Sequence, residues 1–448
     1  MAIQPNNGRI GLHYYPDTIH YREKDLTTWL PVLQALQVRW LVLDAPLERA
    51  IPEYFLQELI RSNIQPVLHF HAKMFPPPNI NDLRMLFEMY SRWGASYIVL
   101  FDKPNIRASW STAAWTQSNL VERFLDIFLP FAKAARETGL IPALPPLEPG
   151  GDYWDTAFLK AALNGMQRRG FSSHELPTLT AYARAGNLPL NWGAGGPERW
   201  PLARPYSERK DTQDQRGFCI YDWYLAISDA VFGEACPMLL LEAGSRLGDR
   251  TDPDNLEIDP SLHAERNNAI LHRLQNQSIE IGPFDMEPIP DNVIACNFWL
   301  LAAAADSPYA KEAWFQPDGN VLPVLNGVVK WEQGLDINTW GLGSTSDEPI
   351  LKTSPSEGMR LINHYLLLPV HDWGIPDWLF EAIRPFVKKY YPTIGFSPSE
   401  AAQAGRVTLL GDESIFPPSL VQKLLDAGCI VERVTGDGTK IASTLANL

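Results

Sequence analysis

The feature that most limits what this chain can fold into is the alternation of short apolar runs with helix-like segments. Roughly the first 340 of the 448 residues contain eight apolar runs of strand length, each followed by a helical pattern or a long loop. Strands that alternate with helices form parallel sheets, and eight such units close into a barrel. We therefore predict an α/β fold: a (β/α)8 TIM barrel at residues 1–345, followed by a linker and a small α/β module at residues 346–448.

The bounds of the predicted elements follow from the apolar periodicity. Predicted barrel strands lie at 9–15, 38–44, 64–71, 96–101, 140–144, 177–183, 237–242 and 292–301. Predicted barrel helices lie at 26–36, 52–61, 80–93, 120–137, 156–169, 220–232 and 263–276, with a last one near Gly327. The C-terminal module has predicted helices at 377–390, at 418–427 and at the C-terminus, and predicted strands at 406–410 and 429–434.

Polar and aromatic side chains gather at the ends of the predicted strands. The residues at or next to these ends are His13, Asp44, His71, Asp102, Tyr182, Glu242 and Trp299. In a (β/α)8 barrel the carboxyl ends of the strands form the functional face. The loops after the fourth to seventh strands are also longer than the ~2–6 residues usual for such turns, which predicts a cleft at this face.

Two apolar strands end in charged residues. The run 96–101 ends in Asp102 and Lys103, and the run 238–241 ends in Glu242. A carboxylate on so apolar a strand is costly unless it is paired or opens onto a wet site. Glu242 is therefore predicted to be either a catalytic nucleophile or base that faces a cleft, or a structural carboxylate held by an ion pair.

The composition narrows the class of ligand. The formal net charge is -14 and the isoelectric point is near 5.1, which argues against nucleic acid or an anionic membrane surface as the main partner. Aromatic residues make up 11% of the chain, with 15 Trp and 15 Tyr, and such side chains offer flat platforms to ring-shaped ligands. A neutral ligand suits this balance of charge.

The cysteines and the apolar runs bear on the cellular compartment of the protein but do not identify it. Cys219, Cys236, Cys296 and Cys429 lack the spacing of zinc sites, so we predict buried free thiols. No apolar run approaches the ~18 residues needed to cross a bilayer, and the N-terminus shows no signal peptide as written. We expect a soluble protein without a membrane span, either cytoplasmic or exported by a route that the chain does not show.

Three short motifs resemble turns of the clan A glycoside hydrolases. The stretch 100–105, Leu-Phe-Asp-Lys-Pro-Asn, is similar to their strand-four Phe-Asn-Glu-Pro-Asn turn, and 241–244, Leu-Glu-Ala-Gly, is similar to their strand-seven nucleophile turn. The stretch 297–299, Asn-Phe-Trp, resembles the strand-eight motif whose Trp floors their sugar site. The resemblance spans roughly residues 8–330 and implies a (β/α)8 barrel, an oligosaccharide or polysaccharide ligand, and a retaining mechanism with Glu242 as nucleophile.

The chain departs from this family pattern at the acid/base position. Lys103 stands where the family has its strand-four Glu, and Asp102 stands where the family has the Asn that binds the sugar 2-hydroxyl. Retaining hydrolysis needs a carboxylic acid as proton donor, whereas lysine, with a reference pKa of about 10.4, is a poor donor. We expect Lys103 to pair with Glu242 or Asp102, and we expect a pseudoenzyme that binds glycan but hydrolyses it slowly or not at all.

Two other interpretations stay open. An active glycosidase could use a relocated general acid, either Asp102 or Glu148 in the loop after the fifth strand. A structural or scaffold protein could keep the barrel only as a packing unit. The candidate catalytic residues are thus Glu242, Asp102 and Glu148, and the predicted glycan contacts are His13, His71, Lys103, Asn105, Tyr182 and Trp299.

Metals, cofactors and protein partners receive weaker support from the sequence. His69 and His71 point to one side of the third strand and could together ligate a metal. No Cys or HxxxH partner accompanies them, so we expect hydrogen-bonded histidines, no metal and no cofactor. The C-terminal module resembles small α/β modules appended to bacterial cell-wall proteins, which implies attachment, a protein partner or self-assembly. Its turn at 436–438 carries neither phosphate-loop sequence.

Overall fold

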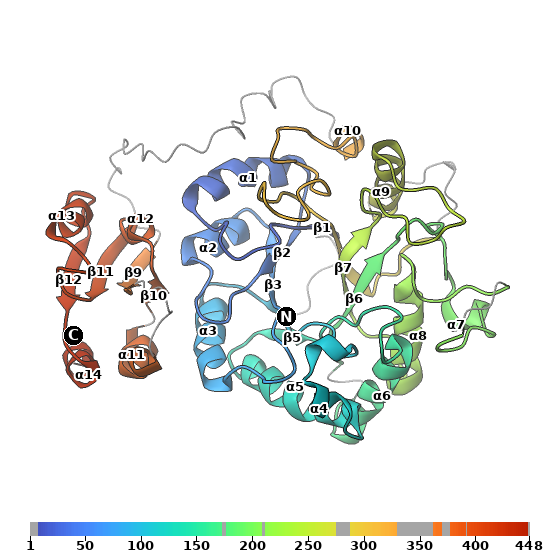
Figure 1. Cartoon of the computed structure of the whole chain (residues 1–448), viewed down its shortest axis with the longest axis horizontal. Coiled ribbons are helices and arrows are strands. Elements are labelled where there is room, and N and C mark those ends of the chain that lie inside the picture. The colour runs from blue at the N-terminus through green and yellow to red at the C-terminus, as the bar shows by residue number, and fades with distance from the viewer. Residues whose placement is uncertain are drawn as a thin grey trace.

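Eight parallel strands form the larger of two sheets in the computed structural model, which describes residues 8–172, 176–207, 211–274, 287–328, 362–369, 377–390 and 392–446. The strand order is β5-β4-β3-β2-β1-β8-β7-β6. A parallel bridge between Ala143 and Thr178 joins β5 to the residue just before β6, so the sheet closes on itself. Figure 1 shows helices surrounding these strands. The predicted (β/α)8 barrel is confirmed.

The barrel elements match most of the predicted ranges to within a few residues. The strands are β1 (Ile10–His13), β2 (Trp40–Asp44), β3 (Gln65–Phe70), β4 (Tyr97–Leu100), β5 (Ile141–Ala143), β6 (Leu179–Arg184), β7 (Met238–Gly244) and β8 (Val293–Phe298). The long helices are α1 (Glu23–Ala35), α2 (Glu53–Arg61), α3 (Ile80–Arg92), α5 (Leu120–Glu137), α6 (Asp155–Arg168), α8 (Ile220–Phe232) and α9 (Pro260–Leu274). Three short helices were not predicted: η1 (Arg107–Ser109), α4 (Thr112–Trp115) and α7 (Gly196–Arg199). The predicted last helix near Gly327 is α10 (Leu325–Val328).

The barrel strands are apolar because both of their faces are buried. One face points into the barrel interior, and the other packs against the surrounding helices. In β7 all seven residues are buried. Leu239 and Leu241 of this strand pack inside the barrel against residues of the other strands, such as Val42 of β2. Gly11 of β1 has no room for a side chain, because a Cβ atom there would lie 2.0 Å from Oδ1 of Asn297. The barrel interior is therefore filled by side chains at these positions, so we expect a ligand site at an end of the barrel.

The C-terminal module is a second, four-stranded parallel sheet with the order β10-β9-β11-β12. Its elements are β9 (Ile362–Leu367), α11 (Asp377–Tyr390), β10 (Thr393–Gly395), α12 (Pro398–Ala401), β11 (Ala404–Leu410), α13 (Pro418–Asp426), β12 (Ile430–Val434) and α14 (Gly438–Ala446). The predicted α/β module is confirmed. Two strands of the module were not predicted: β9, which mixes polar with apolar residues, and β10, which has only three residues. The predicted boundary at 345/346 lies outside the described residues.

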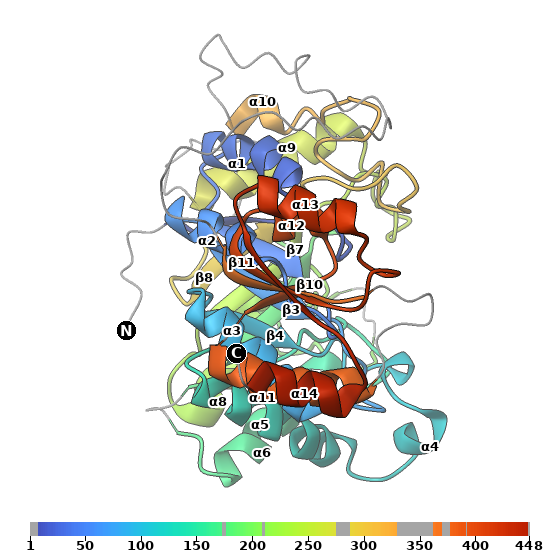
Figure 2. The ribbon, with the colours of Figure 1, turned by 90° about the vertical axis from the view of Figure 1, so that its left-hand side faces the viewer.

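The C-terminal module contacts the helices on one side of the barrel. In Figures 1 and 2 its sheet and helices lie beside α1, α2 and α3. Among the described residues, side-chain hydrogen bonds join the two parts: Gln403 to Glu23 at 2.6 Å, Thr393 to Glu53 at 3.1 Å and Arg384 to Asp82 at 2.9 Å. Because Glu53 and Thr393 are both buried, part of the outer surface of these barrel helices is covered by the module.

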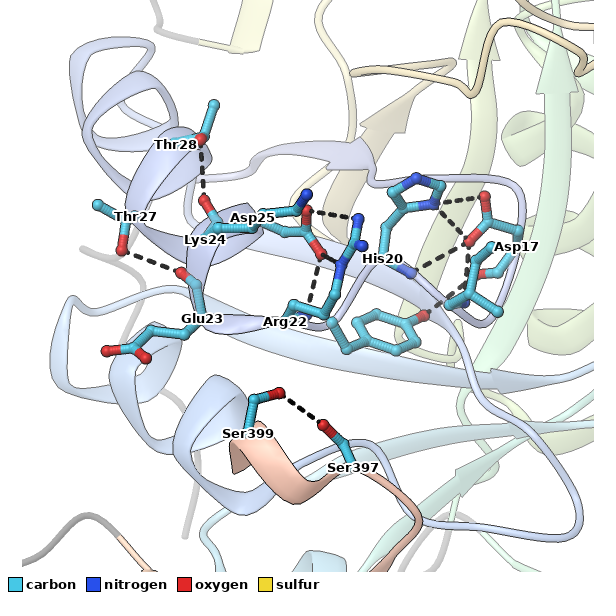
Figure 3. Close-up of polar contacts among 12 residues, drawn as sticks. Asp17, His20, Arg22, Glu23, Lys24, Asp25, Thr27, Thr28, Ser397 and Ser399 are labelled. Atoms are coloured by element: carbon cyan, nitrogen blue, oxygen red, sulfur yellow. Dashed lines mark hydrogen bonds and ion pairs between the residues drawn. The ribbon is translucent and has the colours of Figure 1, made fainter. Parts of the chain in front are cut away.

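Figure 3 shows where the module approaches the first turn of α1. The Asp25 carboxylate accepts a hydrogen bond of 2.9 Å from the backbone N–H of Arg22, which satisfies a donor at the start of the helix. Ser397, the N-cap of α12, and Ser399 in that helix lie near this turn, with 2.8 Å between their hydroxyl oxygens. The capped end of α1 is thus one of the places where barrel and module meet.

The burial of the cysteines and the length and polarity of the helices can be compared with the sequence predictions. All four cysteines are buried thiols. Burial raises the pKa of the Cys219 thiol to about 12, so this thiol stays protonated at neutral pH. Within the described ranges, we find no helix that combines the length and the apolar character needed to cross a membrane.

Candidate functional site

The carboxyl ends of the strands bring most of the predicted site residues into one set of ion pairs, hydrogen bonds and ring contacts, which we name the mouth network. Its members are Asp44, His71, Asp102, Lys103, Glu148, Tyr182, Arg184, Glu242, Arg246, Trp299 and Glu312. They follow or end β2, β3, β4, β5, β6, β7 and β8. The network therefore occupies the face on which this fold places its chemistry.

Glu242, the candidate nucleophile, is buried near the end of β7 and held from two sides. Its φ of 50° lies in the left-handed region, which is rare for a residue with a side chain and concentrates at functional sites. Oε2 accepts hydrogen bonds from Nε of Arg184 at 2.6 Å and from Nη2 of Arg246. Burial raises the pKa of Glu242, but these two guanidinium groups outweigh burial and lower the pKa to about 2.

Arg184 ends β6 and connects two of the candidate catalytic carboxylates. Besides Glu242, it contacts Glu148, with 2.9 Å between Nη1 and Oε1. Its guanidinium carbon lies 4.3 Å from the centre of the Tyr182 ring, which is a cation–π distance. Arg184 was not predicted, although the criterion applied to Glu242 and Asp102, a charge at the end of an apolar strand, would have found it.

Arg246 follows β7, four residues after Glu242, and its Nη2 donates a hydrogen bond to Oε2 of Glu242. Its guanidinium carbon lies 4.4 Å from the centre of the Trp299 ring, and its Nη1 lies 3.7 Å from Oε2 of Glu312. This residue was also missed. A cation so close in sequence to a buried carboxylate was the signal that could have found it.

Lys103, which the resemblance places at the acid/base position, contacts neither of the carboxylates expected for it. Its Nζ lies 3.1 Å from Oε2 of Glu148, so the predicted pairing with Glu242 or Asp102 is wrong. The physical reason lies in the turn: Lys103 has a φ of 47° and its backbone N–H bonds to the carbonyl oxygen of Pro146 at 3.0 Å. This bond ties Lys103 to the loop after β5, where Glu148 lies.

Asp102 lies after β4 and is an ionised acceptor. The Tyr182 hydroxyl donates a hydrogen bond of 2.6 Å to Oδ1, and Nδ1 of His71 lies 3.8 Å from Oδ2. Burial raises the pKa of Asp102, but the neighbouring His71, His69 and Tyr182 outweigh burial and lower the pKa to about 2. At neutral pH this carboxylate holds no proton to donate.

Two histidines lie at the end of β3: His69 is in the strand and His71 follows it. The rings of His69 and His71 lie 3.8 Å apart between centroids. Nε2 of His71 lies 2.9 Å from Oδ1 of Asp44, and Nε2 of His69 lies 3.2 Å from the carbonyl oxygen of Phe101. Burial lowers the pKa of both rings. For His71 the carboxylates of Asp102 and Asp44 outweigh burial and raise the pKa to about 10, whereas the pKa of His69 stays well below its ordinary value.

His13 and Asn105, two predicted glycan contacts, are used within the protein. Nε2 of His13 accepts a hydrogen bond of 3.3 Å from the backbone N–H of Glu242, and burial lowers the pKa of His13 to about 3. Asn105 is fully buried and its amide donates to the carbonyl oxygens of Glu148 and Tyr153, both at 2.9 Å. Both side chains therefore position the backbone around the mouth.

The aromatic side chains predicted as sugar platforms are covered by cations of the chain itself. Tyr182 is 1% exposed and Trp299 is 7% exposed. Arg184 lies against the first ring and Arg246 against the second. A sugar ring could stack on either only after a guanidinium group had moved away.

Two further carboxyl groups flank Arg246, and neither was predicted. Asp249 accepts a hydrogen bond of 2.9 Å from the backbone N–H of Arg246, and Glu312 accepts one of 2.8 Å from Nε1 of Trp299. Burial raises the pKa of both carboxyl groups. They lie in loops without a recognisable motif, so the sequence carries no signal for them.

Comparisons with known proteins bear on the fold only. No protein-family model and no curated protein sequence matches this chain. Three solved structures that match it are a GH128 endo-beta-1,3-glucanase from Sorangium cellulosum, a beta-glucuronidase from Bacteroides uniformis and a family 51 alpha-L-arabinofuranosidase from Bifidobacterium longum. Their sequence identities to this chain are 14%, 11% and 10%, and their TM-scores are 0.41, 0.46 and 0.39.

The three matches differ in the share of this chain and of the matched protein that they cover. The glucanase match covers 72% of this chain and 98% of the glucanase, the glucuronidase match 82% and 38%, and the arabinofuranosidase match 67% and 68%. This chain thus spans well under half of the glucuronidase. It is similar to glycoside hydrolase barrels, and the (β/α)8 assignment itself rests on its own strand order and closure.

Proposed function

We propose that this barrel is a glycan-binding protein that does not carry out retaining glycoside hydrolysis. One observation carries the proposal: Glu242, at the nucleophile position, is held by two guanidinium groups, while Lys103 stands at the acid/base position. A carboxylate nucleophile must approach the sugar carbon that it attacks. Both arginine contacts to Glu242 would have to be given up before that approach.

The proton-donor half of the reaction has no candidate among the predicted acids. General acid catalysis contributes roughly 10²–10⁴-fold to a rate, so a barrel without a donor is at best a very slow enzyme. Asp102 has a pKa near 2 and is therefore ionised. The oxygens of Glu148 already contact Arg184 at 2.9 Å and Lys103 at 3.1 Å. These contacts argue against the relocated-acid interpretation.

Partly exposed polar groups support contact with a glycan. The side chains of His71, Glu148 and Lys103 are 41%, 30% and 25% exposed, and they present donors and acceptors that suit sugar hydroxyls. Since the aromatic platforms are covered, the ligand would be held by hydrogen bonds rather than by stacking. Weak binding is the consequence, because a net hydrogen bond contributes only about 0.5–1.5 kcal/mol.

A glycan array probed with the full chain tests this proposal. We expect binding of at least one oligosaccharide, with the dissociation constant then measured by calorimetry. Lys103→Ala should raise that constant about tenfold, the loss expected for one hydrogen bond to a charged group. Lys133→Ala, which changes an exposed lysine on α5, is the matched control and should leave the constant unchanged. An array without signal from folded protein would contradict glycan binding.

The second candidate function is a structural or scaffold role, and the covered aromatic rings favour it. Burial of Tyr182 and Trp299 beneath arginines is what a barrel kept for packing would show. A blank array would leave this interpretation in place. Attachment or self-assembly through the C-terminal module stays a prediction and fits either function.

A further inference from the structure

We propose that His69, His71 and Asp102 form a binding site for a first-row divalent transition metal ion. One nitrogen of each imidazole and one oxygen of the carboxylate lie within 4.8 Å of one another. His69 lies in β3 and His71 follows it, while Asp102 follows β4, the neighbouring parallel strand, in which Val99 pairs with His69. The spacing of the three groups is therefore set by the barrel rather than by a loose loop.

His69 supplies the observation that points to a ligand. Its Nε2 faces the carbonyl oxygen of Phe101 at 3.2 Å, and because a carbonyl only accepts, the ring proton belongs on Nε2. Nδ1 then carries a lone pair. This atom is buried and, among the residues that the structure describes, has no hydrogen-bond partner. A buried acceptor without a partner is costly, and a bound cation would satisfy it.

His71 and Asp102 face each other across a gap of matching size. Nδ1 of His71 lies 3.8 Å from Oδ2 of Asp102, which is too long for a hydrogen bond. Two atoms bound to one zinc ion at about 2.0–2.2 Å lie roughly 3.3–3.6 Å apart in tetrahedral geometry, so a small movement would suit a shared metal. The metal would replace the proton that His71 otherwise carries on Nδ1.

Each of the three groups is held by a second hydrogen bond on its far side. Phe101 accepts from His69, Asp44 lies 2.9 Å from Nε2 of His71, and Tyr182 donates to Oδ1 of Asp102 at 2.6 Å. Histidines that bind metals almost always donate their other ring N–H to a carboxylate or carbonyl in this way. The arrangement thus fixes the ring orientations and leaves one atom of each group facing the gap.

The kind of ion follows from the donors. Two imidazole nitrogens and one carboxylate oxygen suit zinc and its first-row neighbours, whereas Ca²⁺ and Mg²⁺ prefer sets of oxygen ligands. Three protein ligands leave coordination positions open for water or for a further ligand. Ions can reach the gap, because the side chains of His71 and Asp102 are 41% and 24% exposed.

The test is a titration of the full-length, chelator-treated protein with zinc chloride, followed by calorimetry. We expect one zinc ion per chain. His71→Ala and Asp102→Asn should each weaken binding more than 100-fold, and Asp44→Asn should weaken it about 10–100-fold, as loss of an outer hydrogen bond does. His20→Ala is the matched control, because His20 also pairs with a carboxylate, that of Asp17 at 2.7 Å, but is not one of the three residues of the proposed site. Binding in this variant should be unchanged.

Two results would overturn the site. One is folded wild-type protein that binds no zinc in the titration and shows no rise in melting temperature when zinc chloride is added. The other is zinc binding that the His71 and Asp102 variants, shown by circular dichroism to be folded, retain at wild-type strength. The melting experiment uses only the wild-type chain, so it decides the matter even where a variant does not fold.

Discussion

Replacing Arg184 with alanine is expected to lower the free energy of unfolding by about 3 kcal/mol, the low end of the range for breaking a buried ion pair. Arg184 contacts Glu242 at 2.6 Å and Glu148 at 2.9 Å, so its loss weakens the compensation of two carboxylates at once. The low end of the range applies because the Arg184 side chain is 26% exposed and Glu242 keeps a second partner in Arg246. Urea unfolding followed by circular dichroism measures the change.

Two further variants show whether the geometry of Arg184 matters. Arg184→Lys keeps the charge but loses the planar fork that reaches both carboxylates, so an intermediate loss is expected. Arg168→Ala removes an exposed ion pair with Glu122, whose side chains are 63% and 41% exposed, and should change the free energy by less than about 1 kcal/mol. Equal effects of Arg184→Ala and Arg168→Ala would show that the mouth network does not stabilise the barrel.

Glu242→Gln is expected to destabilise the protein at neutral pH and to matter less as the pH falls. The folded pKa of Glu242 is about 2, below its ordinary value of 4.5. A depressed carboxyl pKa gives stability that is present in full above pH 4.5 and is lost as the pH falls through about 2. The difference of about 2.5 in pKa corresponds to roughly 3 kcal/mol.

Urea unfolding of wild-type and variant protein between pH 7 and pH 2.5, at constant ionic strength, checks this expectation. Asp126→Asn serves as control, since the Asp126 side chain is 66% exposed in its pair with Arg169 and should add little at any pH. A gap between wild type and Glu242→Gln that stays constant down to pH 3 would contradict the ion-pair account of Glu242.

The fold could be predicted from the sequence because a barrel strand covered on both faces leaves a direct mark. The run ending at Leu241 is apolar at every position from Met238 onward, and the burial of all of β7 explains why. The strands β9 and β10 left no such mark, since β9 mixes polar with apolar residues and β10 is too short for a period to show. In both strands the amino-acid pattern within the strand itself was too weak to predict it.

Only those site residues that lie at or near the ends of the predicted strands could be predicted. Asp102, Glu148, Tyr182 and Glu242 do meet at the mouth, because parallel strands bring their carboxyl ends to one face. The choice of partners was not predictable. Lys103 pairs with Glu148 because a backbone bond to the loop after β5 turns it that way, and such pairing across strands leaves no spacing in the sequence.

The measurement that most directly tests the central claim, that Glu242 is a held carboxylate and not a nucleophile, is release of 4-nitrophenol from a panel of aryl glycosides. Such substrates carry a good leaving group and depend least on a general acid, so they give a surviving nucleophile its best chance. We predict that wild-type protein releases no more 4-nitrophenol than buffer alone. The account would be contradicted if the wild type and the Lys133→Ala variant both released 4-nitrophenol while folded Glu242→Gln protein did not.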